Sequence, residues 1–348
     1  MRRVDLLGLA GAAVALLALS LTLSGSRLSL LTFIGLFAIS AIGLSLLGGY
    51  AGQISLGHAA YYGIGAYTSA LLGARYDISP WLGLPAAMFV SGGVAALVGL
   101  PLLQLRGHYL SIGTLAFGII TTVTLNEWRG VTGGPSGFGG IPGFAIGGYE
   151  LTRRDYCLLI WAVALVAAAL ALNLVNSRVG RILRAIRGSE LAVATLGIAV
   201  WRYKLGVFVI SAVYAGAAGA LYAAYLGYVS PSAFTLRVSV ELLTMAAVGG
   251  LASVWGAIIG AATVQVLIDQ IRDLLPRLQE LLHLLIPAVP AQPRGEQELI
   301  AFGLLLLIIM IFAPGGIAGG LNALARRFGA RRGGDRGVTP APAPGTGN

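Results

Sequence analysis

The chain has 348 residues, of which 57% are hydrophobic and only 10% are charged, and its formal net charge is +10. Soluble domains carry about 25% charged residues, so this composition excludes a water-facing globular surface. The single cysteine excludes a disulfide framework and a thiolate metal site.

Stretches without Asp, Glu, Lys or Arg recur along the whole chain. A transmembrane helix needs roughly 20 mainly apolar residues. Lipid also leaves unpaired backbone groups without partners, and residues 28–74 suffice for two spans, so the pattern predicts an all-α polytopic membrane protein with about 8 to 10 transmembrane helices. The stretches cover residues 6–26, 28–74, 78–105, 107–126, 156–177, 205–236, 242–268 and 299–325.

The first apolar stretch follows Arg2 and Arg3. A secretory signal peptide would also begin in this way. The length of the stretch and the lack of a clear small-residue cleavage site favour a retained first span.

Residues 48–67 are the most unusual segment, because they place six glycines and several polar side chains at membrane depth. Glycine weakens a helix by up to about 1 kcal/mol relative to alanine. Small residues permit close helix contact, whereas a broken helix exposes backbone groups to a transported solute. We favour a pathway-lining role, with tight packing as the alternative. The candidate pathway residues here are Gly52, Gln53, Ser55, Gly57, His58, Tyr61 and Gly63.

The loops differ in charge. Residues 127–155 hold three basic and three acidic residues, whereas 178–204 hold six basic residues and one acidic residue. With the amino terminus inside, the positive-inside rule makes the first loop extracytoplasmic and the second cytoplasmic. An interfacial Trp and a glycine-proline turn are also ordinary membrane-surface features, so a functional role for the outer loop stays open. The candidates for the outer mouth are Glu127, Trp128, Gly133, Gly134 and Pro135.

The cytoplasmic loop has an arginine at every third position from Arg178 to Arg187. On a helix this spacing makes one broad basic band, and Ile182, Ala185 and Ile186 add apolar contacts beside it. We therefore expect the segment to enter a groove on a cytoplasmic partner. A topological signal or a site for anionic lipid is the alternative.

A second glycine-rich interruption divides residues 242–268 at Gly249, Gly250 and Gly256. We expect two short helices or a re-entrant hairpin there, which a membrane protein tolerates where backbone lines a cavity. Gly249 and Gly250 are therefore further pathway candidates. Glycine breaks in both halves of the chain are consistent with an inverted repeat around a midplane pathway.

The extra reversal at this interruption puts residues 271–297 outside and returns the arginines after Ala325 to the cytoplasm. Leucines recur at helical spacing in 271–297, which predicts an amphipathic helix on the outer interface. Residues 1–325 then form a single membrane domain. The tail, 326–348, begins basic and ends in a stretch that we expect to be disordered.

Several strings of sequence between residues 40 and 265 carry a family resemblance. They are GYAGQISLGHAAYYGIGAY, LRGHYLSIGTLAFG, TGGPSGFGGIP, SRVGRILRAIRGSELAVATLGI, SPSAF and VGGLASVWGAIIGA. In this order they resemble the LivM-type permease of ABC importers for branched-chain amino acids. His108 is a departure, because such permeases often have an acidic residue there.

The resemblance implies a permease subunit of the bacterial inner membrane that has no ATPase activity, in agreement with the lack of a GxxxxGK phosphate-binding loop. Two cytoplasmic ABC ATPase subunits would use the ATP, and a LivH-like permease and an external solute-binding protein would complete the assembly. Apart from membrane lipid, no cofactor, metal or nucleic acid is expected on this chain. The resemblance places the ATPase coupling loop at Gly180, Arg181, Arg184, Ala185, Ile186, Arg187, Glu190, Ala194 and Gly197.

Other functions remain as alternatives. A urea or short-chain amide permease shares the same sequence features. An ion-coupled carrier would need charged groups inside the membrane, and none lies centrally in the uncharged stretches. An enzyme would need converging acid, base or metal ligands, whereas His58, His108 and His283 are scattered along the chain.

The charge pattern generates a prediction of sidedness. In a Cys157→Ser background, a cysteine at Ser136 is expected to react with an impermeant thiol reagent added outside intact cells. A cysteine at Ser189 is expected to resist it, because six basic residues hold that loop in the cytoplasm. The reversed labelling pattern would invert the topology.

Overall fold

The computed structural model describes residues 3–105, 107–285 and 303, and this part of the chain is almost wholly helical. Seven of its helices are long and apolar enough to cross a membrane, which confirms the predicted all-α polytopic class. The helices are α1 (Arg3–Thr22), α2 (Ser26–Leu44), a π-helical turn (Ser45–Tyr50), α3 (His58–Tyr76), α4 (Pro80–Leu102), α5 (His108–Glu127), α6 (Arg129–Thr132), α7 (Arg153–Asn176), α8 (Arg178–Gly188), α9 (Glu190–Thr195), α10 (Val200–Leu226), α11 (Leu236–Gly249) and α12 (Val254–Leu285), with 3-10 turns at Gly134–Ser136 and Pro231–Phe234.

The uncharged stretches of the sequence become helices as expected. Residues 28–74 divide into α2 with its π turn and α3, and residues 242–268 divide into α11 and α12. Neither α3 nor α11 is among the seven spans, because α3 is rich in tyrosine and glycine and α11 has only 14 residues. The stretch 299–325, apart from residue 303, and the tail 326–348 lie outside the described residues.

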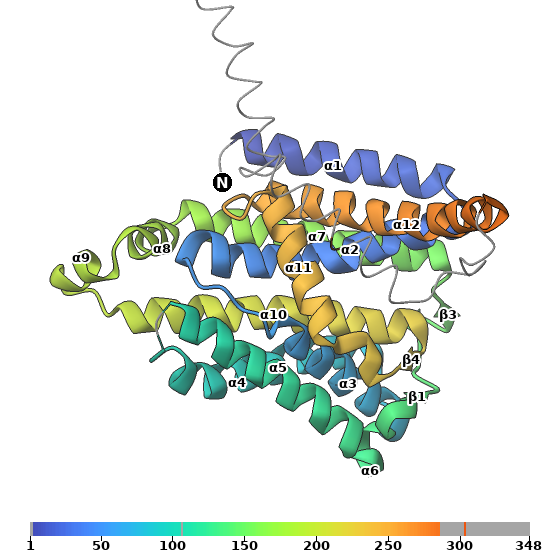
Figure 1. Ribbon diagram of the computed structural model, residues 1–348, viewed down its shortest axis with the longest axis horizontal. Helices are drawn as coiled ribbons and strands as arrows, with labels where there is room; N and C mark the ends of the chain where they lie inside the picture. The colour runs from blue at the N-terminus through green and yellow to red at the C-terminus, as the bar shows by residue number, and fades with distance from the viewer. Residues whose placement is uncertain (1–2, 106, 286–302, 304–348) are drawn as a thin grey trace, which may run out of the picture.

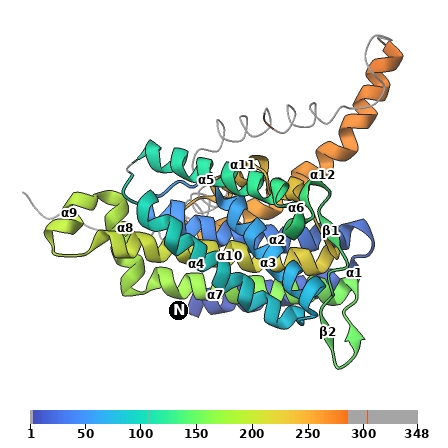
Figure 2. The ribbon, with the colours of Figure 1, turned by 90° about the horizontal axis from the view of Figure 1, so that it is seen from below.

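The long helices run between two ends of the molecule (Figure 1). We call the end that carries α8 and α9 the basic end. The other, the hairpin end, carries α6 and the short strands, and Figure 2 shows the same separation from another direction. The loops that charge assigned to opposite sides of the membrane thus lie at opposite ends of the bundle. The antiparallel pairs are β1 (Phe138–Gly139) with β4 (Tyr228–Val229), and β2 (Ala145–Ile146) with β3 (Tyr149–Glu150).

The course of α12 corrects one expectation. The sequence suggested a separate amphipathic helix over residues 271–297, but α12 runs without a break from Val254 to Leu285 and extends toward the hairpin end (Figure 1). The reason is that no glycine interrupts the chain between Gly260 and Leu285, so the helix begun at the second interruption continues. Residues 286–297 lie outside the described part of the chain.

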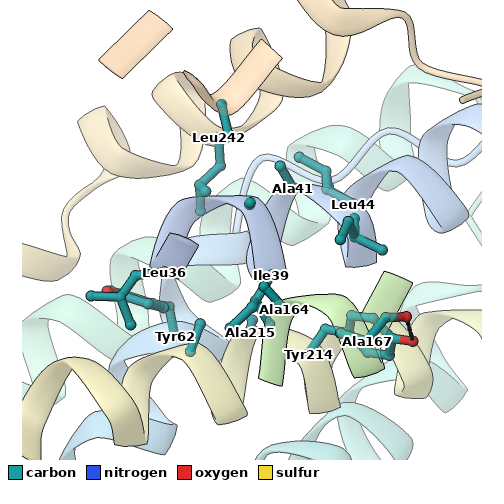
Figure 3. Close-up of a cluster of buried hydrophobic side chains, with 14 of the residues drawn as sticks. Leu36, Ile39, Ala41, Leu44, Tyr62, Ala164, Ala167, Tyr214, Ala215 and Leu242 are labelled. Atoms are coloured by element: carbon teal, nitrogen blue, oxygen red, sulfur yellow. Dashed lines mark hydrogen bonds between the residues drawn. The ribbon is translucent and has the colours of Figure 1, made fainter. Parts of the chain in front are cut away.

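α2 is the central helix of the bundle. Its residues Leu36, Ile39 and Leu44 are at most 1% exposed, as expected of a helix that is apolar all round. Close by, the Tyr214 hydroxyl of α10 donates a hydrogen bond of 2.8 Å to the Ala167 carbonyl of α7. Figure 3 shows the side chains from the surrounding helices in this cluster, which include Tyr62, Ala164, Ala167, Tyr214, Ala215 and Leu242.

Glycine brings α3 and α10 into backbone contact. Gly65 lies against the backbone of Gly216, and a Cβ atom at Gly219 would fall on the Tyr62 carbonyl oxygen. Small residues hold membrane helices together in this way, because lipid supplies no hydrophobic drive for association. Part of the glycine content that the sequence displays therefore serves helix packing.

This packing predicts that Gly219→Val destabilises the fold. The added side chain must displace the backbone of α3, and overpacking of this kind costs about 1–3 kcal/mol. Thermal unfolding of the purified protein in detergent measures the loss as a lowered Tm. Gly206→Val on the same helix is the matched control, because no atom lies within 4 Å of a Cβ atom at Gly206. Equal Tm values for the two variants would contradict the assignment.

Candidate translocation and coupling sites

The first glycine segment, residues 48–67, is a broken helix. α2 ends in the π turn Ser45–Tyr50, and α3 begins at His58. Between them lies a non-helical stretch, residues 52–57, which we call the first break. Gly52 turns the chain with a φ of +70°, a conformation that side chains other than glycine rarely adopt. π turns of this kind are frequent at functional sites.

Hydroxyl groups from distant helices satisfy the backbone around the first break. The Leu56 amide donates to Thr114 Oγ1 on α5 at 3.0 Å, and the Ala59 amide donates to Ser239 Oγ on α11 at 2.9 Å. The start of α3 is thereby anchored on both sides. Thr114 and Ser239 did not stand out in the sequence, because a single hydroxyl in an apolar helix gives no signal of its own.

Polar side chains of the first break and of the start of α3 are buried, and several of their atoms have no hydrogen-bond partner in the described chain. Gln53, Ser55, His58 and Tyr61 are each at most 3% exposed. Both amide atoms of Gln53, Ser55 Oγ, His58 Nε2 and Tyr61 Oη find no hydrogen-bond partner among the described residues. An unsatisfied buried group costs about 1–3 kcal/mol, and such groups are rare in proteins outside functional sites. This concentration is what a solute-handling segment requires.

The other pathway candidates are packed closely. A Cβ atom at Gly57 would fall on the Thr114 carbonyl oxygen, and one at Gly63 would come within 3.0 Å of Phe234. Gly249 of α11 lies against Gly256 of α12, and Gly250 turns the chain between these helices with a φ of +106°. These glycines allow close helix packing, which is one of the two roles considered from the sequence. The unpaired polar groups nearby keep the other role, lining of the pathway, open.

The two interruptions of the sequence meet in space. We call Gly250–Ser253, between α11 and α12, the second break. The Ser45 hydroxyl of the π turn donates to the Leu251 carbonyl at 2.7 Å. Gly49 approaches Leu251 so closely that a Cβ atom there would overlap the same carbonyl. The sequence predicted each break separately, and the structure joins them.

The outer-mouth candidates gather at the hairpin end. Trp128 precedes α6, Gly133 and Gly134 follow it, and Arg75 of α3 donates to the carbonyls of Gly130 and Val131 at 2.8 Å. Glu127 and Pro135 are both exposed beside this turn. A groove of about 330 Å³ opens here between α3, α5 and α6, and its lining includes Tyr67, Phe117, Thr121, Thr124, Trp128 and Thr132.

At the basic end, α8 and α9 carry the residues that the sequence predicted for the coupling loop, and serine side chains cap the start of both helices. The Ser177 hydroxyl accepts from the Val179 and Gly180 amides, and the Ser189 hydroxyl accepts from the Ala192 amide. Leu183 and Ile186 pack into the protein at 2% exposure. The structure therefore assigns Ile186 to an internal contact, whereas Ala185 and the arginines of the loop are exposed.

The arginines of α8 do not form one uniform band. Arg184 donates to the Val175 carbonyl of α7 at 3.0 Å, and Arg187 donates to the Gly49 carbonyl at the end of α2. Both cap helix C-termini, where a cation is favourable. The side chains of Arg178 and Arg181 make no hydrogen bond or ion pair with the rest of the described chain, and they remain available to a partner.

The second half of the loop presents an apolar surface. Glu190 of α9 pairs with the buried Lys204 of α10, and Gly197 lies in the turn between these helices. Leu191 and Leu196 are 78% and 76% exposed. A groove of about 490 Å³ lies beside them, lined by Glu190, Leu191, Ala194 and Val200. Exposed leucines next to a basic helix are typical of a surface that binds another protein.

The fold and the two ends define a polytopic membrane permease. Comparison with known proteins gives its family. Residues 26–314 match the family model described as "Branched-chain amino acid transport system / permease component". No solved structure is significantly similar to the chain.

Curated relatives agree with this match. The high-affinity branched-chain amino acid transport system permease protein LivM of Escherichia coli is 32% identical over 87% of this chain and 73% of its own length. LivM of Salmonella typhimurium is also 32% identical, over 84% of this chain and 70% of its own length. LivH of Escherichia coli is 28% identical over 64% of this chain and 78% of its own length. The chain belongs to this permease family and is of the LivM type.

Proposed function

We propose that this LivM-type permease forms part of an ABC importer that moves branched-chain amino acids across the bacterial inner membrane. The observation that carries the proposal is the pairing of an exposed basic and apolar loop at one end with a broken, polar helix in the interior. The exposed loop can bind an ATPase subunit. A solute beside the broken helix can form the hydrogen bonds that its buried polar groups lack. Membership of the LivM type supplies the substrate class.

The two ends would meet different partners. Two cytoplasmic ABC ATPase subunits serve the assembly, and one docks on α8 and α9 through Arg178, Arg181, Leu191 and Leu196. An external solute-binding protein contacts the hairpin end around Trp128. A LivH-like permease is the second membrane subunit, because relatives of both the LivM and the LivH type match this chain. ATP is bound by the ATPase subunits, and this chain needs no cofactor.

The buried charges favour an ATP-driven importer over an ion-coupled carrier. In the part of the chain that the structure describes, the buried charged side chains are Lys204 and Glu241. Lys204 pairs with Glu190, and Glu241 accepts a hydrogen bond of 2.8 Å from Arg237 one helical turn away. Ion-coupled carriers usually hold charged groups inside the membrane, and both of these charges are neutralised by a fixed partner.

Reconstitution tests the proposed function. The chain, its partner permease and the ATPase subunits are inserted into proteoliposomes with the binding protein outside. We expect leucine uptake that requires ATP on the ATPase side and persists when an ionophore collapses all ion gradients. Uptake that follows the gradient without ATP would establish a carrier. ATP-dependent uptake of urea or acetamide in place of leucine would establish the alternative substrate class.

The unpaired amide of Gln53 gives a sharper test of the pathway. Gln53→Leu removes a buried group that lacks partners, so the Tm is expected to stay constant or rise. Leucine uptake is nevertheless expected to fall by about tenfold, as when a hydrogen bond worth about 1.5 kcal/mol to a passing solute is lost. Gln104→Leu, at the exposed end of α4, is the matched control. Parental uptake by Gln53→Leu would leave the first break with a packing role only.

A further inference from the structure

We propose that Arg187 links the coupling helix α8 to both glycine breaks, so that movement of α8 repositions the backbone of the pathway. This inference rests on the proposed function, because it concerns how work done on α8 by an ATPase reaches the interior. Arg187 would thus be a positioning residue within this chain, and the ATPase contacts would fall to Arg178 and Arg181.

The contact of Arg187 with α2 is the first observation. Its guanidinium donates to the Gly49 carbonyl, which lies in the π turn where α2 ends. Carbonyls at a helix end lack a regular intrahelical donor. The bond from Arg187 therefore satisfies the Gly49 carbonyl, which would otherwise need another donor at the end of α2.

The stem of the same side chain packs on the first break. A Cβ atom at Gly52 would lie 3.2 Å from Arg187 Cγ, and the φ of Gly52 is +70°. Arg187 therefore touches the segment at two points, one by its charged end and one by its methylenes. Arginine can combine both contacts because its stem is apolar and its end is a fork of donors.

The chain of contacts continues from the π turn to the second break. Ser45 in the π turn donates to the Leu251 carbonyl at 2.7 Å, and Gly49 lies directly on Leu251. α8, the first break and the second break thus form one contiguous set of contacts. Coupling between distant sites travels through continuous packed and hydrogen-bonded groups of this kind.

The neighbouring arginine provides a fixed point for the motion. Arg184 donates to the Val175 carbonyl and so holds α8 to the end of α7. A rotation of α8 about that attachment would change the distance between Arg187 and Gly49. Arg187, three residues further along α8, lies against the first break at Gly52.

The test measures the ratio of solute transported to ATP hydrolysed in the reconstituted complex. Arg187→Met keeps an unbranched apolar stem that can pack on Gly52 and removes the guanidinium donors. We expect the complex to assemble with its ATPase subunits and the transport ratio to fall by about fivefold or more, at the lower end of allosteric coupling effects. Arg187→Lys, which keeps one donor group, is expected to recover part of the loss. Arg202→Met, which removes a charge at the same end of the molecule, is the control and should keep the parental ratio.

A second readout follows the break itself. In a Cys157→Ser background, a cysteine replaces Ile54, whose side chain is 50% exposed. Its rate of reaction with a thiol reagent is expected to change between the nucleotide-free and ATP-bound states of the complex. In the Arg187→Met variant, the rate is expected to become independent of the nucleotide.

The outcomes distinguish the proposed role of Arg187 from a role in docking and from failure of the proposed function. A parental transport ratio or a retained nucleotide dependence in Arg187→Met would overturn the inference. Loss of the ATPase subunits from Arg187→Met would also overturn it, because Arg187 would then act in docking. Failure of the parental complex to use ATP for uptake would instead contradict the proposed function.

Discussion

Inside a bilayer, every backbone N–H and C=O group that leaves a helix must find its partner within the protein. This molecule leaves the helical pattern at two glycine breaks, and side chains from other helices satisfy much of the exposed backbone. Thr114 and Ser239 accept from the amides that begin α3. Arg187 and Ser45 donate to carbonyls at the ends of α2 and α11. The broken helices are possible because these groups converge from distant parts of the chain.

The same breaks depend on small residues. At Gly49, Gly65 and Gly219, the backbone of one helix lies directly on that of another, and a Cβ atom would overlap a carbonyl or a Cα atom. The close approach brings donors and acceptors within hydrogen-bond distance. Glycine therefore serves helix packing here and also brings hydrogen-bonding groups of different segments together.

The two ends of the bundle give the fold its direction. Net positive charge is concentrated on α8, whereas the hairpin end carries short strands, a tryptophan and a groove. In an importer, the pathway in the interior must respond both to solute arriving at one end and to the ATPase at the other. The contacts from α8 through the π turn to the second break supply a physical route from the basic end, and the groove beside Trp128 lies at the other end of α3.

The sequence by itself determined the fold class and the positions of both breaks, and it predicted the sidedness of the loops. Charge-free length, the positive-inside bias and glycine content are local properties that act on each segment independently. The family resemblance could also be recognised from the sequence, because it lies in short local motifs.

The tertiary structure decided what those segments do to one another. It tied Arg184 and Arg187 to the carbonyls at the ends of α7 and α2, and it buried Ile186. It also joined Ser45 to Leu251 across 206 positions of the chain. Such pairs depend on which helices pack side by side, and nothing in the composition of either partner specifies the other.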